Sequence, residues 1–380
     1  MPPCPRIVSW AAAVIEISEL CQVMISRRQL LAGGGAGIGA LLVSVAAGSE
    51  LHATTASAVA EPVEIKATAI EHFSKLRPAQ QRFGRLEFRG GLVLTSDHTS
   101  FGGLSDLVIS RDGRQMLFAS DQGHWISAEM TYDGSRPAGL RSAHIGPLRS
   151  AKGQDLTRKR NSDAEAMALV DGTLARGTLV IGFERNHRIG RFPVIDSVVQ
   201  APTGYLKMPD DARRMKPNKG LEALTVLQGG SFKGSILGIA ERYPDPQGHH
   251  TGWIWVKGEP RRFGVRDIGE FDITSATALG DGGVLMLERR FRWTEGVKMR
   301  LRHLPAAQIA PGATIEGETL VEADMTYDID NMEGLAVHTG PRGETVLTMV
   351  SDDNYNTLLQ RTLLLQFTLH AEGVASTRVQ

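Results

Sequence analysis

Cysteine is almost absent from this sequence. The chain of 380 residues contains two, Cys4 and Cys21, and both lie within the first 60 residues. Residues 61–380 therefore have no thiol, which excludes disulfides, cysteine metal ligands and cysteine nucleophiles from that part of the chain. The sequence also has no G-x-S-x-G motif around Ser105 or Ser275, so serine-nucleophile chemistry has no motif in its favour.

Net charge is lacking as well. The 42 basic residues balance 42 acidic ones, and the first 60 residues contribute three Arg and three Glu, so the remainder is also neutral. A neutral chain gives no support for a nucleic-acid partner or for binding to an anionic membrane surface.

The N-terminal region has the features of an export signal. Arg27-Arg28 precedes a glycine-rich apolar run over residues 31–48, and small-residue cleavage motifs follow at residues 56–60. This order predicts a twin-arginine signal over residues 1–60, with Met24 as an alternative start and the periplasm as the destination. After cleavage we expect no stable membrane insertion, although the apolar run is just long enough for a retained anchor to be the alternative.

A hairpin pattern recurs five times between residues 102 and 354. Each copy consists of two short apolar runs joined by glycine- or aspartate-rich turn residues, which is typical of a β-hairpin. No segment shows a helical period over three turns. The leading positions of the copies lie 53 to 60 residues apart: Ser105, Glu165, Glu222, Ser275 and Glu333.

Repeats of this length, each with about four strands, predict an all-β β-propeller. Five blades are recognisable, and residues 61–380 are expected to form one domain. The run over residues 85–96 either supplies the missing outer strand of the last blade or begins a sixth blade. A multi-hairpin sandwich is the alternative fold.

The hairpins predict a ring of acidic residues. The first residue of one strand faces the last residue of its antiparallel partner, and the leading strand of each blade lines the central channel. Ten equivalent positions, eight of them carboxylates, should therefore surround one channel mouth. The predicted pairs are Ser105 with Asp121, Glu165 with Glu184, Glu222 with Glu241, Ser275 with Glu288, and Glu333 with Asp352.

The charge of such a ring must be compensated, because two carboxylates about 4–5 Å apart repel by roughly 3–4 kcal/mol at an effective dielectric constant of about 20. Retained protons, the adjacent Arg185, Arg242 and Arg289, or a bound cation could supply the compensation. Ligands that are all oxygen favour Ca²⁺ over Mg²⁺. A purely structural ring of salt bridges is the alternative.

The repeats resemble the phytase-like family of β-propellers, whose description is esterase-like activity of phytase. The resemblance covers most of residues 61–380 and implies a propeller fold with hydrolytic activity on ester or phosphoester bonds. It supplies no catalytic assignment, and Ala166 replaces the glycine usual after the acid of the second repeat. The matching segments are FGGLS (101–105), DAEAMA (163–168), GLEAL (220–224), LER (287–289), MEGLA (332–336) and SDDN (351–354).

We expect metal-assisted hydrolysis of a small-molecule ester or phosphoester at this mouth. The candidate residues fall into three groups: Glu165, Glu222, Glu333, Asp352 and Asp121 as metal ligands; Glu184, Glu241 and Glu288 as catalytic carboxylates; and His124, His187 and Arg185 as substrate-binding residues. A non-catalytic propeller that binds a ligand or protein, and a lactonase-type hydrolase, are the alternatives.

Overall fold

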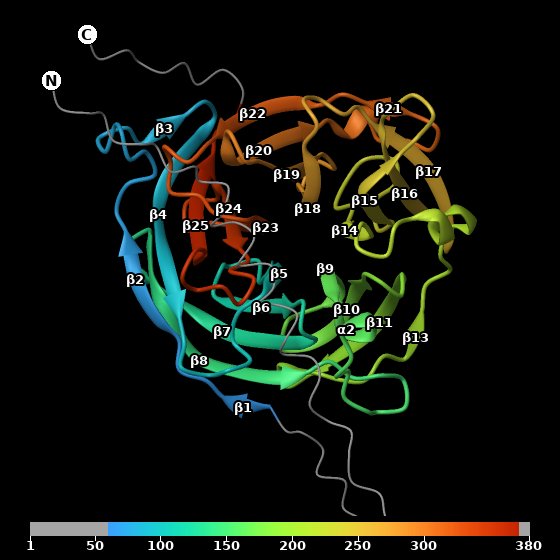
Figure 1. Ribbon diagram of the computed structural model, residues 1–380, viewed down its shortest axis with the longest axis horizontal. Helices are drawn as coiled ribbons and strands as arrows, with labels where there is room; N and C mark the ends of the chain where they lie inside the picture. Colours follow the sequence, from blue (N-terminus) through green and yellow to red (C-terminus); the bar gives the residue numbers. More distant parts are fainter. Residues whose placement is uncertain (1–59, 372–380) are drawn as a thin grey trace, which may run out of the picture. The chain divides into compact units, whose positions relative to one another are not determined.

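The computed structural model describes residues 60–371, and its strands form five sheets around a central axis (Figure 1). This arrangement is a five-bladed β-propeller, as the repeats predicted. Within residues 60–371, no helix has the length and apolar character needed to cross a membrane. The predicted leader, including Arg27-Arg28 and Met24, lies outside the described residues.

The first three blades follow one another along the chain, each running outward from the channel. The first contains β5 (Leu104–Ile109), β6 (Gln115–Ser120), β7 (His124–Asp133) and β8 (Arg136–Pro147), with β1 (Glu61–Pro62) at its outer edge. The second contains β9 (Ala164–Gly172), β10 (Arg176–Phe183), β11 (Arg188–Ile195), β12 (Val198–Val199) and β13 (Gly204–Tyr205). The third contains β14 (Leu221–Val226), β15 (Ile236–Pro244), β16 (His250–Val256), β17 (Glu259–Val265) and β21 (Thr314–Ile315).

The last two blades complete the ring. The fourth contains β18 (Asp272–Ala278), β19 (Val284–Arg292), β20 (Gly296–Leu304) and β22 (Glu318–Ala323). The fifth contains β23 (Met332–Thr339), β24 (Thr345–Ser351), β25 (Thr362–Leu369), β4 (Leu86–Thr95) and β2 (Lys66–Ile70), with β3 (Arg82–Phe83) paired to β4. The short helices are α2 (Lys159–Ser162), η1 (Asp210–Arg214) and η2 (Ala306–Gln308).

The fifth blade closes the propeller with strands from both ends of the described chain. Strand β4 pairs antiparallel with β25, so that Leu86 lies opposite Leu369 and Leu94 opposite Thr362. Residues 85–96 therefore supply the missing outer strand of the last blade and do not begin a sixth one. This pairing decides the blade number left open by the sequence.

The five inner strands, β5, β9, β14, β18 and β23, contact one another around the channel. Each has a β-bulge at the same place, where one residue is skipped in the pairing with the next strand. A bulge leaves this residue unpaired and redirects its side chain. The skipped residues are Ser105, Glu165, Glu222, Thr274 and Glu333.

The observed pairing in the fourth blade differs from the predicted one. The sequence paired Ser275 with Glu288, but the bulge at Thr274 places Ile273 opposite Glu288. Thr274 and Arg289 therefore take the positions predicted for Ser275 and Glu288. A shift of one residue exchanges the two faces of a strand, so the ring position that should hold a glutamate holds an arginine.

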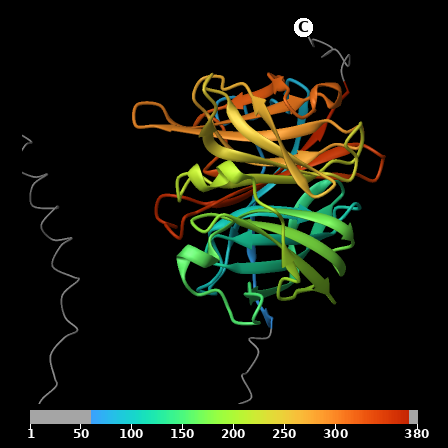
Figure 2. The same ribbon diagram turned by 90° about the vertical axis from the view of Figure 1, so that its right-hand side faces the viewer.

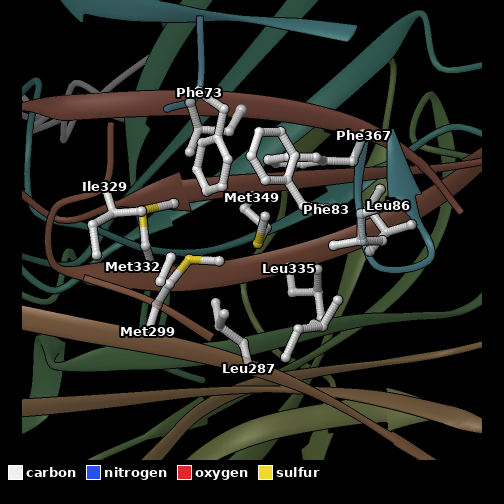
Figure 3. Close-up of a cluster of buried hydrophobic side chains, with 14 of the residues drawn as sticks. Phe73, Phe83, Leu86, Leu287, Met299, Ile329, Met332, Leu335, Met349 and Phe367 are labelled. Carbon is white, nitrogen blue, oxygen red and sulfur yellow. The ribbon is translucent and has the colours of Figure 1, made fainter. Parts of the chain in front are cut away.

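The largest hydrophobic cluster lies where blades four and five meet the segment between β2 and β3 (Figure 3). The ring centroid of Phe73 lies 5.0 Å from those of Phe83 and Phe367, in edge-to-face contact with both. Leu287 and Met299 of blade four belong to the same cluster. The cluster thus ties the N-terminal strands to the blade that they close.

Replacement of Phe367 by alanine should lower the free energy of unfolding by about 3–5 kcal/mol, because the fully buried ring would leave a cavity. Urea unfolding measures the loss. Leu76→Ala is the control, since the Leu76 side chain is 73% exposed and should contribute less than about 0.5 kcal/mol. Equal effects of the two substitutions would contradict the role given to this cluster.

Candidate active site

A cavity of about 650 Å³ opens where the inner strands begin. Nine carboxylates and four cationic side chains line it, an excess of five acids. The carboxylates are Asp121, Asp163, Glu165, Glu184, Glu222, Glu241, Asp330, Glu333 and Asp352, and the cations are Lys159, Arg185, Lys219 and Arg289. The structure therefore brings together all five candidate metal ligands and two of the three candidate catalytic carboxylates.

Glu288, the third candidate catalytic carboxylate, does not line this cavity. Its side chain is fully buried within blade four, and its Oε2 lies 2.7 Å from Nε of Arg300 and 3.0 Å from Nε of Arg302. The prediction that placed Glu288 at the mouth is wrong because its phase in blade four was off by one residue: the bulge that skips Glu222 in blade three skips Thr274 here, so Arg289 corresponds to Glu241. Arg289 faces the mouth instead, with its Nε 3.3 Å from Oε1 of Glu333.

Basic side chains hold several of the acids by ion pairs. Lys159 Nζ lies 2.5 Å from carboxylate oxygens of both Asp121 and Asp163, and Arg185 Nε lies 2.6 Å from the second oxygen of Asp163. Lys219 Nζ lies 2.5 Å from Oε1 of Glu241. The arginine and lysine compensation considered from the sequence is thus present, although it reaches only part of the acidic set.

Glu165 and Glu222 make no ion pair with a lysine or arginine in the described part of the chain, yet both line the cavity. Burial raises the pKa of each well above its usual range, and neighbouring carboxylates raise it further. Burial also raises the pKa of Glu184 and Glu333 to about 7 and that of Asp352 to about 8. At neutral pH, several of these carboxyl groups therefore retain protons when no cation compensates them.

Two groups of three carboxylates have the spacing of a cation site. Their ligand oxygens lie within 4.8 Å of one another, and both groups include Glu184. One group contains Asp163 and Glu165, and the other contains Glu222 and Glu241. The Oε2 atom of Glu241 is buried without a hydrogen-bond partner. These all-oxygen donors fit a hard divalent cation.

Asp163 had not been singled out from the sequence as a site residue. Its backbone oxygen accepts a hydrogen bond from the backbone N–H of Glu184 at 2.8 Å, which places the two residues side by side at the end of their hairpin. The signal was its position two residues before Glu165. Regular strand alternation would place Asp163 and Glu165 on the same face. Glu165 lies at the bulge, and both side chains line the mouth.

Only one of the three candidate substrate-binding residues lines the cavity. Arg185 lines the cavity and has a positive φ of 52° directly after Glu184. His124 and His187 are not among the residues that line it. His124 begins β7, two strands away from the channel, and His187 lies in the β10–β11 turn beside Gly220. Burial lowers the pKa of both histidines.

Asp106 is a buried carboxylate that the sequence analysis missed. It follows the bulge of β5 and is 1% exposed. Its Oδ2 accepts a hydrogen bond from the backbone N–H of Met167 at 2.7 Å, and its Oδ1 accepts one from Oγ of Ser275 at 3.0 Å. Ser275 Oγ also accepts a hydrogen bond from the N–H of Leu335 at 3.2 Å. Asp106 thereby joins the inner strands of blades one, two, four and five.

The fold and the cavity define a five-bladed propeller with an acidic channel mouth. Residues 99–355 match the family model described as Phytase-like, esterase-like activity of phytase. Because this match covers more than half of the chain, the protein belongs to the phytase-like family. Comparison with curated proteins finds no match.

Solved propellers show only weak likeness to this chain. The β-propeller domain of Cps50 (Swd1) from Myceliophteria thermophila is 10% identical with a TM-score of 0.37, covering 81% of this chain and 99% of that one. A hypothetical protein from Leishmania major is 10% identical with a TM-score of 0.38, covering 74% and 90%. U3-55K is 9% identical with a TM-score of 0.35, covering 70% and 77%. We draw no inference from these likenesses.

The position of Asp106 predicts a pH dependence of stability. Burial raises its pKa to about 8 in the folded protein, whereas the unfolded chain has a value near 3.8. The unfolded state therefore ionises first, and stability is lost as the pH rises toward 8. Compared with Asp106→Asn, the wild type should lose roughly 4 kcal/mol of unfolding free energy between pH 5 and pH 9.

Urea unfolding of both proteins across this pH range measures the difference in slope. The slope is informative even if the asparagine variant is less stable at every pH, because asparagine does not titrate. Parallel pH profiles for the two proteins would show that Asp106 is ionised in the folded state throughout.

Proposed function

We propose that this protein is a hydrolase that binds a divalent cation at the channel mouth and cleaves ester or phosphoester bonds there. The observation that supports the proposal is the pair of carboxylate groups sharing Glu184, in a chain of the phytase-like family. Ca²⁺ suits this site better than Mg²⁺, because it accepts six to eight oxygen ligands in flexible geometry.

Glu184 would be the central ligand, with Asp163 and Glu165 on one side or Glu222 and Glu241 on the other. Within the described residues, neither Glu165 nor Glu222 has a lysine or arginine at ion-pair distance, so their ionised forms are the ones that a cation would stabilise most. Its binding would release their protons. The bound cation would then compensate the carboxylate charge that the described lysines and arginines leave uncompensated.

Three candidate ligands lie in the same cavity outside these two groups: Glu333, Asp352 and Asp121. Arg289 holds Glu333, and Lys159 holds Asp121. We therefore assign Glu333 the role of general base. Its carboxylate faces the cavity, Arg289 orients it, and a pKa of about 7 suits proton transfer near neutral pH.

When bound, a divalent cation would act as a Lewis acid on the acyl or phosphoryl oxygen of the substrate. Glu333 would accept the proton of the attacking water. Arg185, whose guanidinium lines the cavity beside Asp163, would donate a hydrogen bond to a substrate oxygen. These roles use residues from blades two and five, so the substrate would lie across the channel mouth.

Glu184→Gln should abolish the response to cation, because both carboxylate groups lose their shared member. After EDTA treatment, millimolar Ca²⁺ should raise the melting temperature of the wild type by several degrees but leave that of the variant unchanged. The kcat/KM for nitrophenyl acetate or nitrophenyl phosphate should fall at least about 100-fold, as expected for the loss of a cation ligand. Calorimetry and initial rates measure the two effects.

Glu71→Gln is the matched control, since Glu71 is 56% exposed and pairs with Arg136 away from the cavity. It should keep the full Ca²⁺ response. A wild-type melting temperature that ignores both Ca²⁺ and EDTA would remove the cation from the proposal. Cation binding without turnover of any ester would favour a ligand-binding propeller.

We also propose export to the periplasm by the twin-arginine route, supported by Arg27-Arg28 and the apolar run that follows. Replacement of both arginines by lysine should retain the protein in the cytoplasmic fraction of a bacterial host. Fractionation with immunodetection measures the distribution. Unchanged delivery of the double variant to the periplasm would refute this route.

A further inference from the structure

Large apolar side chains are exposed at the rim of the mouth cavity. Trp293 is 93% exposed and Leu359 is 80% exposed. Burial in the folded protein therefore does not explain an apolar residue at either position. All of the apolar lining residues come from blades four and five or the loops between their strands: Phe291, Trp293, Val297, Met325 and Leu359. We call these five residues the apolar rim.

The hairpin that carries Trp293 extends from the same side of the propeller as α2 and the β24–β25 loop (Figure 2). Ion pairs fix this hairpin at its turn. Glu295 lies 2.7 Å from Arg290, 3.0 Å from Arg292 and 2.8 Å from Lys298. The Trp293 ring contacts Phe291 edge-to-face at 5.4 Å. The two aromatic rings are therefore held in position without being covered.

The β24–β25 loop that carries Leu359 is also anchored. The Tyr355 hydroxyl donates a hydrogen bond to the backbone oxygen of Ser100 at 3.2 Å, and the N–H of Tyr355 donates to Oδ1 of Asp353 at 3.1 Å. The N–H of Leu359 bonds to the carbonyl of Asn356 at 2.9 Å. An anchored loop loses little conformational entropy when a ligand covers it.

The charged residues that line the rest of the cavity limit the net charge of a ligand that can bind there. Both candidate cation groups come from blades two and three or the segments leading into them, whereas the apolar rim comes from blades four and five. With nine carboxyl groups and four cationic side chains, the cavity has no excess of positive charge to hold a polyanion, whereas an uncharged ligand needs none. All the apolar lining residues therefore come from blades four and five, where Asp330, Glu333 and Asp352 also lie, whereas blades two and three supply only polar and charged lining residues.

We propose that the substrate is an uncharged ester with an apolar acyl or aryl group, which rests on the apolar rim while the ester group faces the carboxylates. This inference rests on the proposed function for the choice of the mouth as the reaction site. The binding of the apolar group can nevertheless be tested without turnover, so the two can fail separately.

Acrylamide quenching of tryptophan fluorescence tests the binding on the full chain. Trp125, Trp253 and Trp255 are at most 4% exposed. The difference in fluorescence between the wild type and Trp293→Phe gives the contribution of Trp293 alone. Octan-1-ol should lower the quenching constant of this Trp293 component at least about twofold, because apolar contact removes it from solvent. Phytate, added with EDTA present, should leave it unchanged.

Protection by phytate with none by octan-1-ol would overturn the proposal. Protection that rises with protein concentration alone would also overturn it, since a second copy of the chain would then cover the rim. Leu359→Ser should weaken the octan-1-ol effect. Leu76→Ser, at a 73% exposed site outside the cavity lining, is the matched control and should preserve it.

The kinetic test compares nitrophenyl octanoate with nitrophenyl acetate. The ratio of their kcat/KM values should fall about tenfold in Trp293→Ala, because the longer chain loses its contact. Leu76→Ser should keep the wild-type ratio. An unchanged ratio in Trp293→Ala would place the apolar group elsewhere. If neither ester is hydrolysed, the proposed function fails while the quenching result still decides on the rim.

Discussion

One extra residue in the inner strand of every blade determines which side chains reach the channel mouth. The bulge leaves Glu165, Glu222 and Glu333 outside the regular pairing of their hairpins. Because side chains alternate between faces of a strand, the same skip sends the next residue toward a different environment. In blade one that next residue is Asp106, which becomes a buried link between blades. The acidic mouth and the link through the channel thus have one geometric origin.

Departures from fivefold repetition make the acidic mouth tolerable. The fourth blade contributes Arg289 where the other four contribute Asp121, Glu184, Glu241 and Asp352, and Lys159 and Lys219 enter from the connections before blades two and three. Arg289 pairs with Glu333, whereas the two lysines pair with Asp121, Asp163 and Glu241. In the described part of the chain, Glu165 and Glu222 have no ion pair with a lysine or arginine, so the uncompensated charge is concentrated on two bulge residues. A site with this imbalance can bind a cation more readily than an evenly compensated ring.

The sequence was sufficient for the fold class, the blade spacing and the convergence of Glu165, Glu222, Glu333 and Asp352. Hairpin phase carries that information, because each repeat has the same pair of apolar runs. It was insufficient in blade four, where Thr274-Ser275 gives no sign of which residue is skipped. Asp106 was missed because the repeat pattern does not show that the residue after the bulge is buried between blades. Trp293 and Leu359 lie in connections whose course depends on tertiary contacts, so no periodic pattern could mark them as neighbours of the acids.

The pairing of β4 with β25 has a consequence for how the chain reaches its final form. The strand that covers one edge of β4 is the last strand of the described residues, so Leu86 is synthesised long before its partner Leu369. Until then that edge presents unpaired backbone groups, which invite association with other chains. Completion also requires contacts between residues nearly at opposite ends of the domain, a topology that slows folding. The closing blade is therefore where a nascent molecule of this protein is most exposed to misassembly.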